Sequence, residues 1–273
     1  MDDQRLKQIS SFYDQKKLQT FLESVLGTNF FHVGLYGEDK LTVDEASQAI
    51  LAKMLKLLPK VNKSTKFLEL GSGRGAAARF IVDVYGSKID CVNLSKVENK
   101  AHQKLNTKEE VYGTSIKILE GDFEDMLFES SNYDFVLAQE SLLHSMEKEH
   151  VFRQITRALK PEGRLVITEI MKTDAADEDH TFKAEEHGLV ELATLATYKR
   201  LARTNNLYTA YIREMPEELK KHLEAMQTVM DQQKKKVSGP DLKTIGEILQ
   251  ESINAVDGEL LTWGILVFQK INT

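Results

Sequence analysis

The segment FLELGSGRGAAARF, which begins at Phe67, constrains the fold of this chain more than any other. A short apolar run that contains Glu69 breaks at Gly71, Gly73 and Gly75 and then continues as an alanine-rich run typical of a helix. Glycines permit unusual backbone angles and leave room for a ligand beside the main chain. A helix start adds unpaired N–H donors and the positive end of a dipole. The segment therefore predicts a strand, a tight turn and a helix that together bind a nucleotide-like cofactor.

Later landmarks separate two kinds of cofactor site. The glycine spacing also fits the dinucleotide pattern G-x-G-x-x-G/A, which needs an acid at the end of the next strand to bind ribose. Here the next predicted strand ends in Asn93, an amide. Further along lie GDF at 121–123, YDFVL at 133–137 and LKPEG at 159–163. In this order the motifs resemble those of a class I S-adenosylmethionine (SAM) dependent methyltransferase, and an NAD(P)-dependent enzyme is the alternative.

Apolar runs alternate with helical patterns from residue 66 to residue 170. Strands are predicted at 66–70, 88–93, 115–119, 133–138 and 164–170, with helices at 75–86, 95–105 and 146–159. Near-continuous apolar strands separated by helices indicate a parallel sheet covered on both faces. With the resemblance, this predicts a single α/β domain, 1–273, with a doubly wound, mostly parallel, seven-stranded Rossmann-like sheet. The segment 258–270 is expected to be an antiparallel strand at the sheet edge.

Two segments lie outside this alternation. Residues 1–37 begin with an amphipathic helical pattern that reaches about residue 30, with Gly27 as its stop, and are expected to form a helical lid. Residues 174–250 have helical periodicity and one possible strand at 207–213, and we interpret them as a substrate-binding cap inserted near the C-terminus. Two capping boxes are expected at helix starts, one from Thr42 with Glu45 and one from Ser95 with Glu98.

Composition limits the partners and the location. The net charge of −6 at pH 7 argues against a nucleic-acid partner, because such proteins usually carry a basic surface. The N-terminus lacks a signal-peptide pattern and no run of 18 apolar residues occurs, so a cytoplasmic protein with no membrane association is expected. Cys91 is the single cysteine and is expected to be a buried core thiol. No cluster of Cys and His predicts a metal site, and a monomer or homodimer is expected.

Candidate cofactor residues follow from the sheet. In an open α/β sheet the ligand lies over the carboxyl ends of the strands. Glu69 is expected to hold the methionine ammonium group of SAM, beside the turn formed by Gly71 and Gly73. Asn93 is expected to bind the ribose hydroxyls, since an amide both donates and accepts hydrogen bonds.

The later strands supply further candidates. Asp122 and Phe123 are expected to meet the edge and the face of adenine, and Gln139 follows a strand where a polar side chain meets the cofactor. His144 lies at the mouth of the same strand and is the leading candidate for catalysis.

The resemblance reaches beyond the superfamily. The segments FHVGLY at 31–36, QESLLHS at 139–145 and LTWG at 261–264 look like those of sarcosine/dimethylglycine N-methyltransferases, which complete glycine betaine synthesis. The similarity spans nearly the whole chain and is weakest in 174–250. It implies further cofactor contacts at His32, Val33 and Leu94. The related phosphoethanolamine methyltransferases use a Tyr–His pair that latches the site, and Tyr13 and His144 match those positions.

The resemblance implies methyl transfer from SAM to a small amine, most readily sarcosine or dimethylglycine, with S-adenosyl-L-homocysteine as the second product. The Tyr–His pair would accept or relay the amine proton. Tyr36, Tyr198 and Trp263 are candidates to face the cationic product, and Arg213 is the candidate partner of the acceptor carboxylate. A phosphoethanolamine methyltransferase, a methyltransferase for another small acceptor and a non-catalytic SAM-binding protein are the alternatives.

Overall fold

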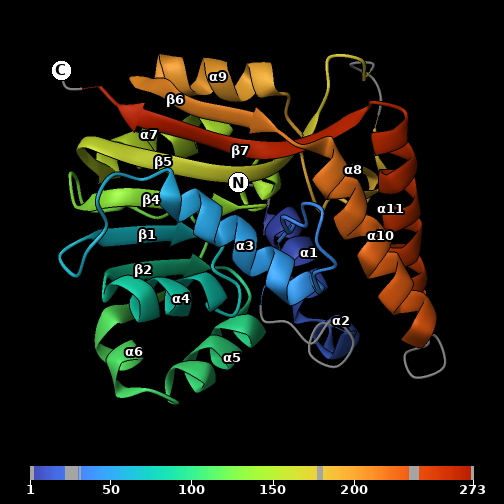
Figure 1. Ribbon diagram of the computed structural model, residues 1–273, viewed down its shortest axis with the longest axis horizontal. Helices are drawn as coiled ribbons and strands as arrows, with labels where there is room; N and C mark the ends of the chain where they lie inside the picture. The colour runs from blue at the N-terminus through green and yellow to red at the C-terminus, as the bar shows by residue number, and fades with distance from the viewer. Residues whose placement is uncertain (1–2, 22–29, 31, 177–180, 234–239, 272–273) are drawn as a thin grey trace.

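The computed structural model describes residues 3–21, 30, 32–176, 181–233 and 240–271. Its centre is a seven-stranded sheet in the order β3-β2-β1-β4-β5-β7-β6 (Figure 1). The strands are β1 (Lys66–Leu70), β2 (Lys88–Asn93), β3 (Ile116–Glu120), β4 (Tyr133–Gln139), β5 (Leu159–Lys172), β6 (Leu207–Glu214) and β7 (Leu261–Lys270). Strands β1 to β5 pair in parallel, and β7 is antiparallel to both of its neighbours. The predicted doubly wound, mostly parallel sheet of seven strands is confirmed.

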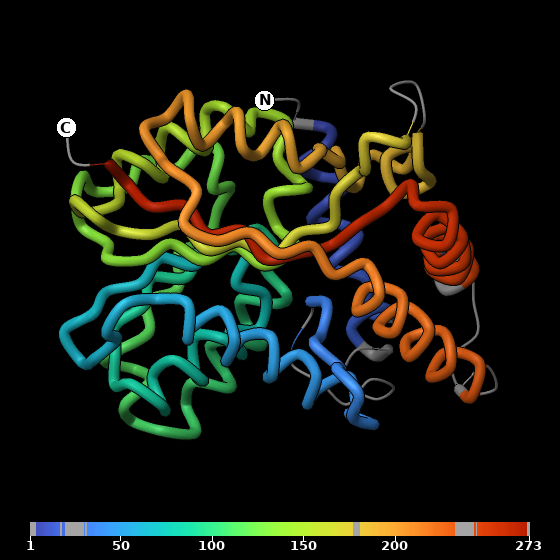
Figure 2. The backbone as a smooth tube through the Cα atoms, turned by 45° about the horizontal axis from the view of Figure 1, so that its top comes forward, coloured from blue at the N-terminus to red at the C-terminus, as the bar shows by residue number. Residues whose placement is uncertain are grey.

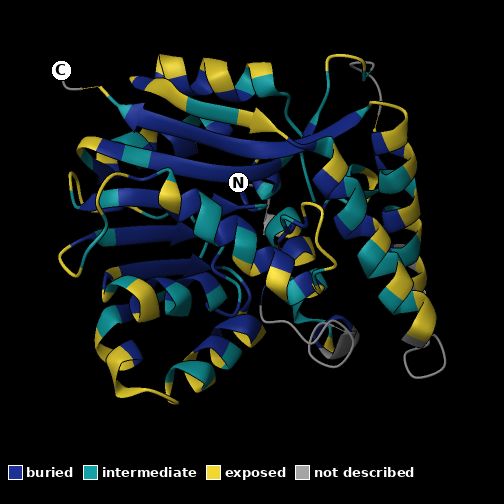
Figure 3. Cartoon of the chain, in the orientation of Figure 1, coloured by how far each residue is buried: buried dark blue, intermediate teal, exposed yellow. Residues whose placement is uncertain are grey.

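Helices cover both faces of this sheet (Figure 1). On one face pack α3 (Val43–Lys56), α4 (Ala76–Tyr85), α10 (Pro216–Gln233) and α11 (Pro240–Asp257), and on the other pack α7 (Lys148–Ala158) and α9 (Leu195–Thr204). Successive side chains of a strand point to opposite faces, so Phe67 and Leu68 of β1 enter two separate hydrophobic cores. Figure 3 shows buried strands beneath helices whose outer faces are exposed.

The end of the sheet differs from the prediction. The last strand was expected at the edge, but β7 lies between β5 and β6, and β6 is the edge strand. The reason lies in the side chains: β7 is buried over nine consecutive residues, as a strand with neighbours on both sides requires, whereas most of β6 is exposed or half-buried. The possible strand at 207–213 is thus a full member of the sheet, and this part of the 174–250 segment is not a separate cap.

The rest of the 174–250 segment is mainly helical. Besides α9 it contains the short α8 (Lys183–Glu186), all of α10 and most of α11. Figures 1 and 2 agree in placing α10 and α11 side by side at one end of the sheet. This pair stands beyond the strand ends at which the glycine turn lies.

Local helix signals are mostly realised. Thr42 and Glu45 form the expected capping box at the start of α3. At α5 (Lys96–Asn106) half of the expected box forms: the Ser95 hydroxyl accepts from the Glu98 N–H, but the Glu98 carboxylate turns to Asn93 instead. The N-terminal pattern forms two helices, α1 (Asp3–Asp14) and α2 (Lys16–Phe21), and the expected stop at Gly27 lies outside the described residues. A short α6 (Glu110–Ser115) was not predicted.

Gly75 is the glycine on which the local packing depends most. Its φ of 72° lies in the left-handed region, and a Cβ added there would lie 1.9 Å from Nε2 of the buried His102 ring. Gly75→Ala should therefore lower the free energy of unfolding by about 2–5 kcal/mol, the sum of left-handed strain and overpacking. Chemical denaturation measures the change.

Gly113→Ala is the matched control, because an added Cβ there meets nothing within 4 Å and its φ is not in the left-handed region. Its free energy of unfolding should stay within about 1 kcal/mol of that of the natural chain. Any change should be an increase, because alanine forms helices better than glycine. Equal losses in the two variants would contradict the packing argument.

Candidate functional site

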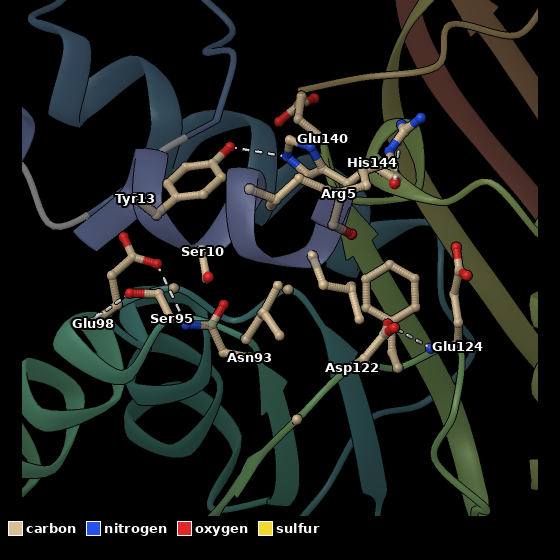
Figure 4. Close-up of a pocket in the computed structure, with 18 of the residues that line it drawn as sticks. Arg5, Ser10, Tyr13, Asn93, Ser95, Glu98, Asp122, Glu124, Glu140 and His144 are labelled. Carbon is tan, nitrogen blue, oxygen red and sulfur yellow. Dashed lines mark hydrogen bonds between the residues drawn. The ribbon is translucent and has the colours of Figure 1, made fainter. Parts of the chain in front are cut away.

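A pocket opens at the carboxyl ends of the central strands, and α1 lies across it (Figure 4). Seven of the predicted cofactor residues line this pocket: Gly71, Gly73, Asn93, Leu94, Asp122, Phe123 and Gln139. They come from the ends of β1, β2, β3 and β4, which the strand order places side by side. We call this cavity the cofactor pocket.

The cofactor pocket offers a ligand open space and polar groups without partners. A Cβ at Gly73 would meet only a carboxylate oxygen of Glu98, 4.0 Å away, so the loop leaves open space beside its backbone. Both polar atoms of the Gln139 amide and Oδ2 of Asp122 are buried with no hydrogen-bond partner among the described residues. Burial raises the pKa of Asp122 to about 6. Such groups are available to a polar ligand, and Phe123 adds an aromatic face beside them.

Glu98 is a functional candidate that sequence reasoning missed. It lines the cofactor pocket, and the Asn93 amide donates to its carboxylate at 3.3 Å (Figure 4). Burial raises the pKa of Glu98. The sequence pattern placed an amide where the superfamily has an acid, and the structure brings a carboxylate back to that amide from the first turn of α5. An acid three residues into a helix that follows the second strand was the available signal, but it was interpreted as a cap.

Tyr13 and His144 are brought together although 131 residues separate them. The Tyr13 hydroxyl lies 2.9 Å from His144 Nε2 (Figure 4). On the other side of the ring, His144 Nδ1 lies 2.6 Å from the Leu189 carbonyl oxygen. A carbonyl only accepts, so Nδ1 carries the proton and Nε2 accepts from the tyrosine hydroxyl. Desolvation lowers the pKa of His144 to about 4 and raises the pKa of Tyr13. Both groups are therefore neutral at pH 7.

A second pocket adjoins the first and shares Tyr13, Glu140 and His144 with it. It lies under α10 and α11, and we call it the acceptor pocket. His32 and Val33, expected at the cofactor, line this second pocket and are absent from the lining of the first. His32 Nδ1 donates to the Val33 carbonyl, and its buried Nε2 has no partner among the described residues.

Glu140 stands in the wall between the pockets and is a second group that sequence reasoning missed. Its backbone has a φ of 43°, a strained value for a side chain with a Cβ. Trp263 Nε1 donates to its carboxyl at 2.6 Å and the Val33 N–H donates at 3.2 Å. Burial raises the pKa of Glu140 to about 8. The signal for it was its position, directly after a strand end and four residues before His144.

Five predicted residues line neither pocket. Glu69 is buried in the core beside Cys91, and burial raises its pKa to about 7. Tyr36 and Trp263 act from behind the acceptor pocket, where the Tyr36 hydroxyl lies 3.1 Å from His222 Nδ1 and Trp263 supports Glu140. The other two lie elsewhere: Tyr198 in the opposite core and Arg213 on the exposed side of β6.

The position of Arg213 follows from the pairing of its strand. Its strand is the sheet edge, and the residue is exposed and absent from both pocket linings. The expectation rested on its place near the end of a strand assigned to the cap. Because that strand joins the sheet instead, Arg213 does not reach the acceptor pocket.

Comparisons with known proteins agree with this geometry. A family model described as a methyltransferase domain matches residues 68–167. The sarcosine/dimethylglycine N-methyltransferase of Halorhodospira halochloris is 26% identical over 98% of each chain. A solved structure from Galdieria sulphuraria, assigned provisionally as a sarcosine dimethylglycine methyltransferase, is 30% identical with a TM-score of 0.85 and covers 94% of this chain and 99% of its own.

The chain belongs to the class I SAM-dependent methyltransferases. Its cofactor is SAM, and it is an enzyme of this class. The phosphoethanolamine N-methyltransferase 2 of Haemonchus contortus, solved with phosphomonomethylethanolamine and S-adenosylhomocysteine, shares the fold at 17% identity and a TM-score of 0.81, over 97% of this chain and 61% of its own.

Within the described parts of the chain, no group of three or more His, Cys, Asp or Glu side chains is arranged to hold a metal ion. None of the helices described is long and apolar enough to cross a membrane.

Gly73 tests the cofactor pocket directly. Gly73→Ala should weaken SAM binding by about tenfold or more, because the added methyl projects where the loop leaves space for the ligand. Isothermal titration calorimetry of SAM binding measures this.

Gly86→Ala is the control for backbone strain. Gly86 also has a left-handed φ, of 64°, but it ends α4 and lies outside both pockets. It should lose similar stability and keep the SAM affinity of the natural protein. A folded Gly73→Ala protein with unchanged affinity would show that the glycine turn does not hold SAM.

Glu140 should make stability depend on pH. The folded pKa of about 8 lies above the ordinary value of 4.5, so the unfolded chain loses this proton first as the pH rises. The Glu140 contribution to stability is present below pH 4.5 and is lost toward pH 8, by up to about 1.4 kcal/mol per pH unit. Glu140→Gln should remove this loss. The free energy of unfolding of the variant should therefore increase relative to that of the natural protein as the pH rises.

Urea denaturation across this pH range measures the difference. Glu129→Gln, at an exposed position, is the control and should follow the natural protein at every pH. Parallel curves for Glu140→Gln and the natural chain would mean that the Glu140 carboxyl is not protonated in the folded protein near neutral pH.

Proposed function

We propose that this methyltransferase transfers a methyl group from SAM to the nitrogen of a small amine. The observation that carries the proposal is the Tyr13–His144 hydrogen bond at the junction of the cofactor and acceptor pockets. The names of the relatives make sarcosine or dimethylglycine, in glycine betaine synthesis, the first acceptors to test. Phosphoethanolamine or another small acceptor is the alternative, and a non-catalytic SAM-binding role is the alternative of a different class.

The cofactor pocket suggests how each part of SAM is held. The glycine turn at Gly73 lies beside the open space, and the Asn93–Glu98 pair is suited to the ribose hydroxyls, since it offers both acceptors and a donor. Asp122 and Phe123 are suited to the edge and face of adenine. Glu69, buried away from the pocket, would reach the methionine end only through other groups.

The chain's own residues can manage the proton of the amine. SAM, when bound, supplies a methyl group already activated on a sulfonium; the amine lone pair forms the new N–C bond while the S–C bond breaks and its electron pair stays on sulfur. An alkylamine must lose its proton before it attacks, and Tyr13 with His144 provides a hydroxyl and a neutral imidazole as a relay from the pocket. Glu140 lines both pockets, and its carboxyl oxygens can accept a hydrogen bond from the ammonium form.

Labelled methyl transfer tests the proposal. The protein is incubated with methyl-labelled SAM and, separately, glycine, sarcosine, dimethylglycine and phosphoethanolamine, together with other amines, a phenol and a thiol. Mass spectrometry then locates the label. Transfer to nitrogen is expected, and label found on oxygen, sulfur or carbon alone would refute N-methylation.

The Tyr13–His144 pair should act as one unit. Tyr13→Phe and His144→Ala should each lower kcat by about 10²–10⁴-fold with little change in SAM affinity, and the double variant should be little worse than either single variant. Steady-state kinetics with the best acceptor measure kcat, and calorimetry measures SAM binding.

Tyr112→Phe serves as the control, because this tyrosine also makes a hydrogen bond, to Asp83, but lies outside both pockets. Its kcat should match the natural protein. Fully additive losses in the Tyr13 and His144 variants would mean that the two side chains act independently.

Several expectations stay predictions. These are the lid role of residues 1–37, the acceptor role of the helical parts of 174–250, the cytoplasmic location and the monomeric or homodimeric state.

A further inference from the structure

The acceptor pocket is lined mainly by apolar side chains. Of the 23 described residues that line it, sixteen are aliphatic, Met, Ala or Phe. They come from elements far apart in the chain, including Phe12 on α1, Phe182 before α8, Leu223 and Met226 on α10, and Leu249 on α11. The pocket is therefore built as a hydrophobic chamber, with the helices of the C-terminal segment forming part of its wall.

The polar groups of the chamber offer no positive charge to an anion. Neither Arg nor Lys is among its lining residues in the described parts of the chain. Its three histidines are neutral at pH 7, since burial lowers the pKa of His32 and of His144 to about 4 and that of His222 to about 3. The other ionisable residues of the described lining are two acids, Glu251 and Glu140, and burial raises the pKa of Glu140 to about 8, so this carboxyl is mostly protonated at pH 7.

This lining is unfavourable for the acceptors of the named relatives. A carboxylate or phosphate moved from water into such a chamber loses its hydration and gains no ion pair. Arg213, the expected carboxylate partner, lies on the exposed side of β6. A protonated amine, in contrast, finds the Glu140 carboxyl and the unpartnered Nε2 of His32.

The chamber is also larger than a minimal acceptor needs. Its volume is about 260 Å³. An engineered apolar cavity of roughly 150 Å³ already holds benzene, which has about as many non-hydrogen atoms as dimethylglycine. Phe12, Phe30 and Phe182 in the wall are suited to an apolar body and to the face of a quaternary ammonium product.

We propose that the acceptor is a secondary or tertiary amine attached to an aliphatic or aryl-alkyl body, with neither a carboxylate nor a phosphate group. Glu140 and the Tyr13–His144 pair meet the nitrogen at the pocket junction, and the chamber holds the apolar body. This substrate class rests on the proposed N-methylation and departs from the acceptors of the named relatives.

Matched acceptors test the class. N,N-dimethylphenethylamine and N,N-dimethylphenylalanine differ by one carboxylate, and dimethylglycine keeps the carboxylate without the apolar body. With labelled SAM, kcat/KM for N,N-dimethylphenethylamine or N,N-dimethylhexylamine should exceed that for both amino acids by about tenfold or more. A higher kcat/KM for dimethylglycine or phosphoethanolamine would overturn the inference and leave N-methylation standing.

A binding measurement separates the two proposals. Calorimetry in the presence of S-adenosyl-L-homocysteine compares two quaternary products, trimethylphenethylammonium and glycine betaine. The first should bind about tenfold more tightly or better. Equal or tighter binding of betaine would overturn the substrate class. The expected binding order with no methyl transfer to any amine would support the class and refute the proposed function.

A positive charge placed in the chamber should shift the preference toward glycine betaine. Met226→Arg introduces a cation among the lining residues of α10 and should change the ratio of the two affinities by about tenfold in favour of betaine. Thr228→Arg adds the same charge at an exposed position of the same helix and should leave the ratio unchanged. An unchanged ratio in folded Met226→Arg would count against the chamber as the acceptor site, and the ligand comparison on the natural protein decides the class if that variant does not fold.

Discussion

The site depends on the reversal of strand order between β1 and β4. The chain leaves β1 through the glycine turn into α4 on one face of the sheet, and it leaves β4 toward α7 on the other face. Two neighbouring parallel strands whose chains diverge at their carboxyl ends leave a crevice there. Gly71 permits this geometry, since a Cβ on it would lie 2.5 Å from the Ser141 Cβ of the opposite loop. The cofactor pocket is a consequence of topology before any ligand-binding side chain is considered.

The Tyr13–His144 hydrogen bond then determines how that crevice is closed. It joins the end of α1, the first helix described, to the loop after β4. The helix thereby covers the cofactor pocket and shields its polar groups from water. Desolvation in turn keeps both partners neutral, because burial disfavours the imidazolium and the phenolate alike. An imidazole with such a low pKa is a weak base. The proposed role of His144 is therefore to relay a proton during methyl transfer, and not to deprotonate a free ammonium ion beforehand.

Much of the sheet could be predicted from sequence because its signals are local. Apolar runs bounded by glycine and the capping box at Thr42 need no partner elsewhere in the chain. The position of β7 between β5 and β6 could not be predicted, because pairing depends on which edge a distant strand leaves open. The roles of Glu98 and Glu140 could not be predicted for a similar reason. In the sequence each looks like an ordinary acid, and only the folded chain brings the nearby Asn93 to Glu98 and the distant Trp263 to Glu140.

The two pockets obey different structural constraints. Sequence resemblance to known enzymes is therefore more informative about the cofactor pocket than about the acceptor pocket. The cofactor pocket is made from strand ends and turns, whose spacing is fixed by the sheet, so motif residues such as Gly73 and Asp122 arrive at the cofactor pocket together. The acceptor pocket is walled by α10 and α11, and any apolar helix face can cover the sheet there. The charge of its lining is therefore not set by the sheet, although each charge buried there costs free energy unless it is paired. A chain can keep the methyl-transfer junction of its relatives and still exclude their anionic acceptors, because the junction and the chamber are built from separate parts.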